Sequence, residues 1–278
     1  MKNYLLNVFF IFLLIAFPVS SHAGLQLEGA FIQGGLLHGH INQGSRLYSG
    51  ERQLKISPNG DFILGFGRDA ALQQALIEVA PDGTSHRHKI ELKKREYDIQ
   101  KINGIKKRMM SPNEDDLRRI SQEAGLVATA RKQNSARMNF MESFIWPVTG
   151  RISGVYGSQR VLNGEPRRPH FGIDIAAPTG TSVKAPAGGV VTLAHQGMFF
   201  SGATLIIDHG HGLSSSFLHL SEILVKEGEQ VSQGQTIAAV GATGRVTGPH
   251  LDWRINWFDQ RLDPALLVPA MPQKSISK

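Results

Sequence analysis

Short apolar runs separated by turn-forming residues dominate the first part of the chain. Residues 24–108 contain strand-like runs such as Phe62–Phe66 and turn signals at Ser57-Pro58-Asn59-Gly60-Asp61 and Pro81-Asp82-Gly83. Runs of this length, broken by Pro, Gly, Asn and Asp, are typical of strands joined by tight turns. The pattern predicts a small β domain over residues 24–108, either a sandwich or a barrel.

Helical spacing is confined to one stretch, residues 109–143. Apolar residues recur there at intervals of three and four between Leu117 and Val127. Ser111-Pro112-Asn113-Glu114 resembles a capping box with Pro at the first helical position. We therefore expect a helix that ends near Ala136 and connects two β domains.

The pattern returns to β-branched runs and dense turns over residues 144–270. Strand-like runs occupy residues 189–193, 203–207 and 235–240, and no helical spacing separates them. Without crossover helices the sheet should be antiparallel. The fold class predicted for the whole chain is mainly β: an antiparallel C-terminal domain, preceded by a small β domain and a connecting α-helix. Residues 271–278 are predicted to form a flexible tail.

Residues 1–23 have the features of a secretory signal peptide. Lys2 precedes an apolar run from Val8 to Phe17, and Ser21-His22-Ala23 has the small-x-small form of a cleavage site. The alternative is a membrane anchor, but the run is too short to span a bilayer. We expect a periplasmic or secreted protein with no stable membrane span once the signal is removed.

Charge and cysteine content narrow the class of partner. The chain carries a formal net charge of +7 and has no cysteine. The positive charge suits cell wall, a membrane surface or nucleic acid, and export makes nucleic acid the least suitable of these. Without disulfides, core packing must hold an exported fold together, with or without the help of a metal ion.

Histidines and aspartates gather in three segments of the C-terminal region. They are Pro169-His170-Phe171-Gly172-Ile173-Asp174, Phe217-Leu218-His219, and Pro249-His250-Leu251-Asp252. His250 and Asp252, two residues apart on a strand, share one face. His170 and Asp174 would lie about 13 Å apart on a straight strand, so a bend at Gly172 is needed to bring them together. Imidazole and carboxylate are suitable zinc ligands, although each such pair is also common as a structural hydrogen bond.

The order and spacing of these segments resemble those of lysostaphin-type (LytM-like) zinc peptidoglycan endopeptidases. His170 and Asp174 match the family's H-x-x-x-D motif, Leu218-His219-Leu220-Ser221 matches its H-L-S segment, and residues 241–251 match its G-x-T-G-x-S-T-G-P-H-L segment. The resemblance covers about residues 146–269. It implies zinc as the cofactor, His170 and Asp174 as zinc ligands, and His219 and His250 as catalytic residues that act on water and the oxyanion. The implied substrate is a peptide cross-link of peptidoglycan.

Asp252 stands where the family has the second His of H-x-H. A carboxylate binds zinc at about the same distance as imidazole, so we expect Asp252 to be the third metal ligand. Two carboxylates would cancel the charge of the ion, which should weaken its effect on bound water. Three interpretations stay open: an active zinc endopeptidase, a site for another metal, or an inactive binding module that activates a cell-wall amidase. The partners considered besides peptidoglycan are a cell-wall amidase and divisome proteins.

Other candidates are weaker. The pairs His38/His40 and His86/His88 are expected to lie at the surface, and His195 to be structural. His209 and His211 are expected in a hairpin turn without a ligand role. Residues 160–168 are expected to form a loop at the rim of the site, whose arginines either meet substrate carboxylates or are solvated.

Overall fold

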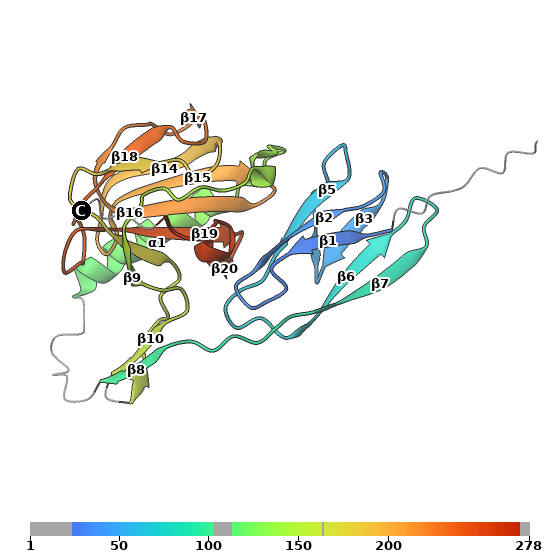
Figure 1. The fold of residues 1–278 in the computed structure, drawn as a ribbon, viewed down its shortest axis with the longest axis horizontal. Coiled ribbons are helices and arrows are strands. Elements are labelled where there is room, and N and C mark those ends of the chain that lie inside the picture. Colours follow the sequence, from blue (N-terminus) through green and yellow to red (C-terminus); the bar gives the residue numbers. More distant parts are fainter. Residues whose placement is uncertain (1–23, 103–112, 163, 273–278) are drawn as a thin grey trace, which may run out of the picture.

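The computed structural model describes residues 24–102, 113–162 and 164–272. Figure 1 shows small sheets from the N-terminal region on one side of the molecule and a large sheet on the other. The predicted signal peptide, residues 1–23, lies outside the described residues, as does most of the predicted tail.

Two antiparallel sheets form the N-terminal region, in agreement with the predicted β class. One contains β1 (Gln26–Gly29), β2 (Leu36–His40) and β5 (Asp61–Gly65) in that order. The other has the order β4 (Arg52–Gln53), β3 (Arg46–Ser49), β6 (Gln73–Val79) and β7 (Ser85–Glu91). Leu37, Phe62 and Leu76 are among the fully buried side chains that join these sheets to the core.

The connecting helix is α1, Glu114–Arg131. Asn113 caps it by accepting a hydrogen bond from the Asp116 backbone at 2.8 Å. The helix therefore begins two residues later than the Ser111 capping box implied, and it ends at Arg131 rather than near Ala136. Within the described part of the chain, no helix is long and apolar enough to cross a membrane.

The C-terminal region is built on a ten-stranded antiparallel sheet, as predicted. Its main path has the order β17-β14-β15-β16-β19-β12-β9, with β18 beside β16, β13 beside β18, and β20 beside β19. The strands are β9 (Arg151–Gly154), β12 (Ile173–Ala176), β13 (Ser182–Lys184), β14 (Gly189–Met198), β15 (Gly202–Gly210), β16 (Leu213–Ile223), β17 (Gln230–Val231), β18 (Thr236–Val240), β19 (His250–Trp257) and β20 (Gln260–Leu262). Two short 3-10 helices, η2 (Asn139–Met141) and η3 (Pro264–Leu266), flank the sheet.

Alternation along β19 separates the two faces of this sheet. Leu251, Trp253 and Ile255 are fully buried in the core, whereas His250, Asp252 and Arg254 point to the opposite face. On that opposite face, Val127 and Ala130 of α1 pack against Leu193, Met198 and Ile206. The helix thus covers part of the polar face and leaves the rest open for a site.

A third small sheet corrects one prediction. Residues 160–168, expected as a loop, contain most of β10 (Gln159–Leu162) and all of β11 (Glu165–Pro166). β10 pairs in parallel with β8 (Ile99–Ile102), a segment far away in sequence. Such a pairing is invisible to local pattern reading because its partner lies about sixty residues upstream.

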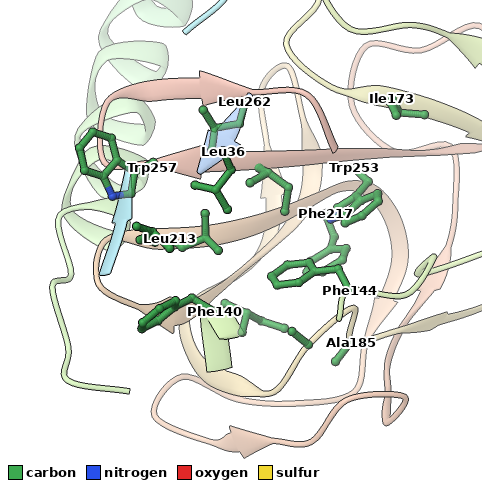
Figure 2. Close-up of a cluster of buried hydrophobic side chains, with 14 of the residues drawn as sticks. Leu36, Phe140, Phe144, Ile173, Ala185, Leu213, Phe217, Trp253, Trp257 and Leu262 are labelled. Carbon is green, nitrogen blue, oxygen red and sulfur yellow. The ribbon is translucent and has the colours of Figure 1, made fainter. Parts of the chain in front are cut away.

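Apolar packing and two ion pairs, Arg52–Asp259 and Arg95–Asp263, join the N-terminal region to the region of the large sheet. Figure 2 shows Leu36 lying beside Leu262 and Trp257. A Cβ atom on Gly65 would lie 2.7 Å from the Cβ of Trp257, so only glycine fits there. Arg95 contacts Asp263 at 2.8 Å, and the two side chains are 22% and 5% exposed.

We predict that Asp263→Ala lowers the free energy of unfolding by about 2–4 kcal/mol, since it leaves the Arg95 guanidinium partly buried without its partner. The change also removes the hydrogen bond from the Ala265 backbone to the Asp263 carboxylate. Urea denaturation measures the effect. Glu96→Ala is the matched control, because Glu96 is 92% exposed and its contact with Lys94 is 3.8 Å long. An equal loss in the two variants would contradict the importance of the ion pair.

The hairpin of β15 and β16 carries two of the histidines. His211 lies in the turn, as expected, whereas His209 lies within β15. His209 is fully buried, and its two ring nitrogens lie 2.7 Å from the Gly188 carbonyl and 2.8 Å from the Ser215 hydroxyl. The ring of His211 packs against Phe140 at a tilt of 37°, with centroids 4.3 Å apart. Burial lowers the pKa of both histidines, that of His211 to about 4.

We predict that stability falls as the pH drops from about 6.5 toward 4. The unfolded chain takes up protons on these histidines near their ordinary pKa of about 6.5, before the folded protein does, so acid favours the unfolded state. Denaturation at a series of pH values should show a smaller slope for His211→Gln than for the wild-type protein. An equal slope for the two proteins would exclude His211 as a cause of the loss of stability in acid. His86→Gln, at an exposed position, serves as control.

Candidate metal centre

Strand register brings two carboxylates together. β12 and β19 are antiparallel neighbours, and Asp174 lies directly opposite Asp252. The chain bends at Gly172, as the sequence suggested, and places His170 beside Asp174. His170 Nε2 and Asp174 Oδ1 are 3.2 Å apart.

The three predicted ligands converge. One nitrogen or oxygen from each of His170, Asp174 and Asp252 lies within 4.8 Å of the others, and among the described residues this is the group found suited to hold a metal ion. His170 Nε2 and Asp174 Oδ1 are buried and have no hydrogen-bond partner. Two ligands at 2.0–2.1 Å from a tetrahedral zinc ion would lie about 3.3 Å apart. The donor types fit such an ion, and so do the 3.2 Å separation and the unsatisfied state of His170 Nε2 and Asp174 Oδ1.

Two glycines make room for the carboxylates. A Cβ atom on Gly172 would lie 2.4 Å from Asp252 Oδ1, and one on Gly154 would lie 2.2 Å from Asp174 Oδ2. Any side chain at either position would displace a carboxylate from the cluster. Gly172 is therefore required for close approach as well as for the bend.

Arg254 is a site residue that the sequence reasoning missed. Its Nε donates to both carboxylate oxygens of Asp252, at 2.9 and 3.1 Å, and its Nη2 donates to Oδ2. Burial alone would raise the pKa of Asp252, but the charge and hydrogen bonds of Arg254 outweigh burial and lower it. The spacing Asp-x-Arg on a strand, which puts both side chains on one face, was the available signal.

His219 and His250 present their Nε2 atoms as free groups. Nδ1 of His219 lies 2.9 Å from the Thr243 carbonyl, and Nδ1 of His250 lies 2.9 Å from the Gly248 carbonyl. Because a carbonyl only accepts, each Nδ1 must carry a proton, so Nε2 is the acceptor of whichever ring is in its neutral form. The two rings are 4.9 Å apart, and His250 Nε2 lies 3.8 Å from Asp174 Oδ1.

The backbone and protonation of His219 suit a chemical role. Its φ of 64° is unusual for a residue with a side chain, and such strain is concentrated at functional sites. Burial lowers the pKa of His219, which keeps the ring neutral near pH 7. In contrast, burial opposes the charged form of His170, but the close approach of Asp174 Oδ1 at 3.2 Å and the charges of both aspartates raise its pKa.

The remaining histidines lie outside this cluster. His40 pairs with Asp61 at 2.9 Å and His88 with Glu78 at 2.8 Å. His38 stacks on Phe140 and burial lowers its pKa, so it departs from the expected surface position. His86 is exposed, and the side chains of His40 and His88 remain 45% and 31% exposed. His195 accepts a hydrogen bond from the Gly197 backbone within its own strand.

Comparison with known proteins shows which family has a similar sequence over this site. The profile of peptidase family M23 matches residues 168–264, which include all five predicted site residues. The chain is 32% identical over 200 residues to the peptidoglycan DD-endopeptidase ShyA of Vibrio cholerae, covering 69% of this chain and 42% of ShyA. It is 40% identical over 115 residues to ShyC of the same organism, covering 41% of this chain and 23% of ShyC.

A solved structure shows that the similarity includes the three-dimensional fold. A Pseudomonas aeruginosa protein described as a candidate peptidase M23 superposes with a TM-score of 0.67 at 29% identity, covering 85% of this chain and 94% of that one. The chain spans less than half the length of ShyA or ShyC. Fold, motif order and matched profile agree: residues 168–264 form a peptidase M23 domain of the LytM/lysostaphin type.

Proposed function

We propose that this protein is a zinc metalloendopeptidase that hydrolyses peptide cross-links of peptidoglycan outside the cytoplasm. The observation that carries the proposal is the convergence of His170, Asp174 and Asp252 beside two histidines with free Nε2 atoms. The peptidoglycan endopeptidases ShyA and ShyC support the substrate class. The positive charge of the chain suits an anionic cell wall.

His170, Asp174 and Asp252 would hold the ion. A bound zinc ion supplies Lewis-acid polarisation of the scissile carbonyl and lowers the pKa of water. His219 or His250 accepts a proton from the attacking water at Nε2 and returns it to the leaving amine. The other histidine, when its Nε2 is protonated, donates a hydrogen bond from that atom to the developing oxyanion. The Thr243 and Gly248 carbonyls hold both rings in the tautomer that this requires.

Arg254 changes the charge balance expected from the sequence. A His-Asp-Asp set neutralises a divalent ion, whereas a His-Asp-His set leaves one positive charge. The guanidinium bound to Asp252 restores that positive charge. Asp252 and Arg254 together have a net charge of zero, as a neutral histidine does. This charge balance favours a functional metal site over one that has lost its activity.

The same ion pair supports one alternative. If Arg254 holds both oxygens of Asp252 so firmly that no metal binds, the domain would serve as a binding module that activates a cell-wall amidase. In that case the sheet face would recognise a partner protein. The two functions predict different consequences for the histidines.

We predict that the purified protein binds zinc and releases peptides from purified peptidoglycan. His170→Ala should lose both zinc and activity. His219→Ala should keep zinc and lose about 10²–10⁴-fold in rate, as removal of a general base does. Metal analysis and chromatography of the digest measure these outcomes. His86→Ala, at an exposed position in the N-terminal region, is the control.

The enzyme function would be contradicted if the protein holds no zinc and digests no peptidoglycan even with added zinc. The activator function would be supported if, in addition, the wild-type protein and His170→Ala stimulate an amidase equally well.

A second prediction concerns Asp252→His, which would recreate the usual ligand set. Alone, this change leaves Arg254 without its carboxylate. It should cost about 2–3 kcal/mol of stability, less than the about 3–5 kcal/mol typical of a fully buried pair, because Arg254 is 23% exposed. It should also weaken zinc binding roughly tenfold or more, since an unpaired cation then lies beside the ion.

The double variant Asp252→His/Arg254→Gln should recover both stability and zinc affinity. Thermal unfolding and competition with a zinc-binding dye measure the two quantities. If the single variant binds zinc more tightly than the wild-type protein, the charge balance assigned to Arg254 is wrong.

A further inference from the structure

A cavity of about 930 Å³ opens between α1 and the polar face of the large sheet. One wall is apolar and comes largely from α1, with Ile120, Val127 and Met198 among its side chains. The other contains arginines from four parts of the chain: Arg131 at the end of α1, Arg168 just before His170, Arg254 on β19 and Arg261 on β20. Arg254 lines the cavity and also binds Asp252, so the cavity adjoins the metal centre.

These arginines outnumber the carboxylates available to them. Within the part of the chain that the structure describes, Arg254 alone of the four is paired with a carboxylate, and Arg131, Arg168 and Arg261 have none within 4.0 Å. Two acidic residues also line the cavity, but both are engaged. Glu123 binds Arg119 and the Phe199 backbone, and Asp259 binds Arg52.

Arg131 shows the deficit most clearly. Its Nη2 donates to the Ser216 hydroxyl at 2.9 Å, whereas its Nε is buried and has no hydrogen-bond partner. Buried donors are almost always satisfied, so this unpaired Nε is a further sign that the positive charge beside the cavity is not balanced among the described residues. Burial and the neighbouring arginines lower the pKa of Arg131, and they lower that of Arg261 to about 10. An anion would relieve this mutual repulsion.

The shape and chemistry of the cavity define the ligand. Guanidinium groups bind carboxylates through paired, charge-assisted hydrogen bonds. The apolar wall suits the aliphatic part of a peptide. Arg254 lies between the cavity and Asp252, so a peptide bound in the cavity lies one side chain away from the metal centre. We propose that Arg131, Arg168 and Arg261 form a subsite for a free carboxylate of the substrate peptide, which makes the protein prefer acidic peptides over amidated ones. This inference rests on the proposed function.

The test compares two synthetic peptidoglycan peptides that differ only in whether their free carboxylates are amidated. Calorimetry should show that the wild-type protein binds the acidic peptide about 10–100-fold more tightly, and that this preference shrinks with added salt. Arg168→Gln and Arg261→Gln should each lose about tenfold for the acidic peptide and nothing for the amidated one. Both should keep the wild-type zinc content.

Two further variants sharpen the comparison. Arg131→Gln should show the same loss, and since Arg131 supports the end of α1, its thermal unfolding is measured alongside. Arg87→Gln is the matched control, because Arg87 is an exposed arginine on β7. Arg168 is also exposed, so its replacement should leave the fold intact and keep the test decisive.

Equal binding of the two peptides, or unchanged binding by Arg168→Gln and Arg261→Gln, would overturn the subsite. Displacement of the peptide by inorganic phosphate but not by acetate would assign the cluster to phosphate and likewise overturn it. Cleavage of both peptides with equal efficiency would leave the proposed enzyme standing without the subsite. Selective binding without cleavage would keep the subsite and refute the enzyme.

Discussion

Asp174 and Asp252 lie opposite each other on adjacent strands, and most of the site follows from this one register. Like charges at directly opposed positions destabilise a sheet unless a cation lies between or beside them. The fold supplies one cation, Arg254, from the same face of β19. The remaining negative charge belongs to Asp174, whose Oδ1 is buried without a hydrogen-bond donor. The pairing of the two strands therefore leaves an unbalanced negative charge, which a divalent metal ion can balance.

The two faces of the large sheet divide stability from chemistry. One face carries the core, in which residues from the N-terminal sheets and from β19 form a single apolar cluster. The other face carries the metal ligands, the two histidines and the arginines. Because residues alternate along each strand, a core residue such as Trp253 separates each polar residue of β19 from the next. The rigid core thus fixes the spacing of the functional groups.

Sequence reasoning located the fold class and the cluster of candidate residues because both depend on local patterns. Alternating runs predicted antiparallel strands, and the positions of His170, Asp174, His219, His250 and Asp252 followed from motif order. The pairing of β8 with β10 and the contact of Arg95 with Asp263 could not be predicted, since each joins segments far apart in sequence. Arg254 was not predicted, although it lies only two residues from Asp252. The motifs point to residues that bind a metal, and they carry no signal for the cations that balance those residues. The domain boundaries and the roles of the site residues stay predictions.

The position of α1 has a consequence for how the domain is delimited. The matched family profile begins at residue 168, yet Arg131 and the apolar wall of the cavity come from a helix that ends well before it. β9, which pairs with β12 beside Asp174, also precedes the profile. A fragment cut at the profile boundary would keep every candidate metal ligand while losing one wall of the cavity and one neighbour of the ligand-bearing strand. The smallest unit that preserves the cavity and both neighbours of β12 therefore includes α1, and the segment predicted to be a linker supplies one wall of the cavity.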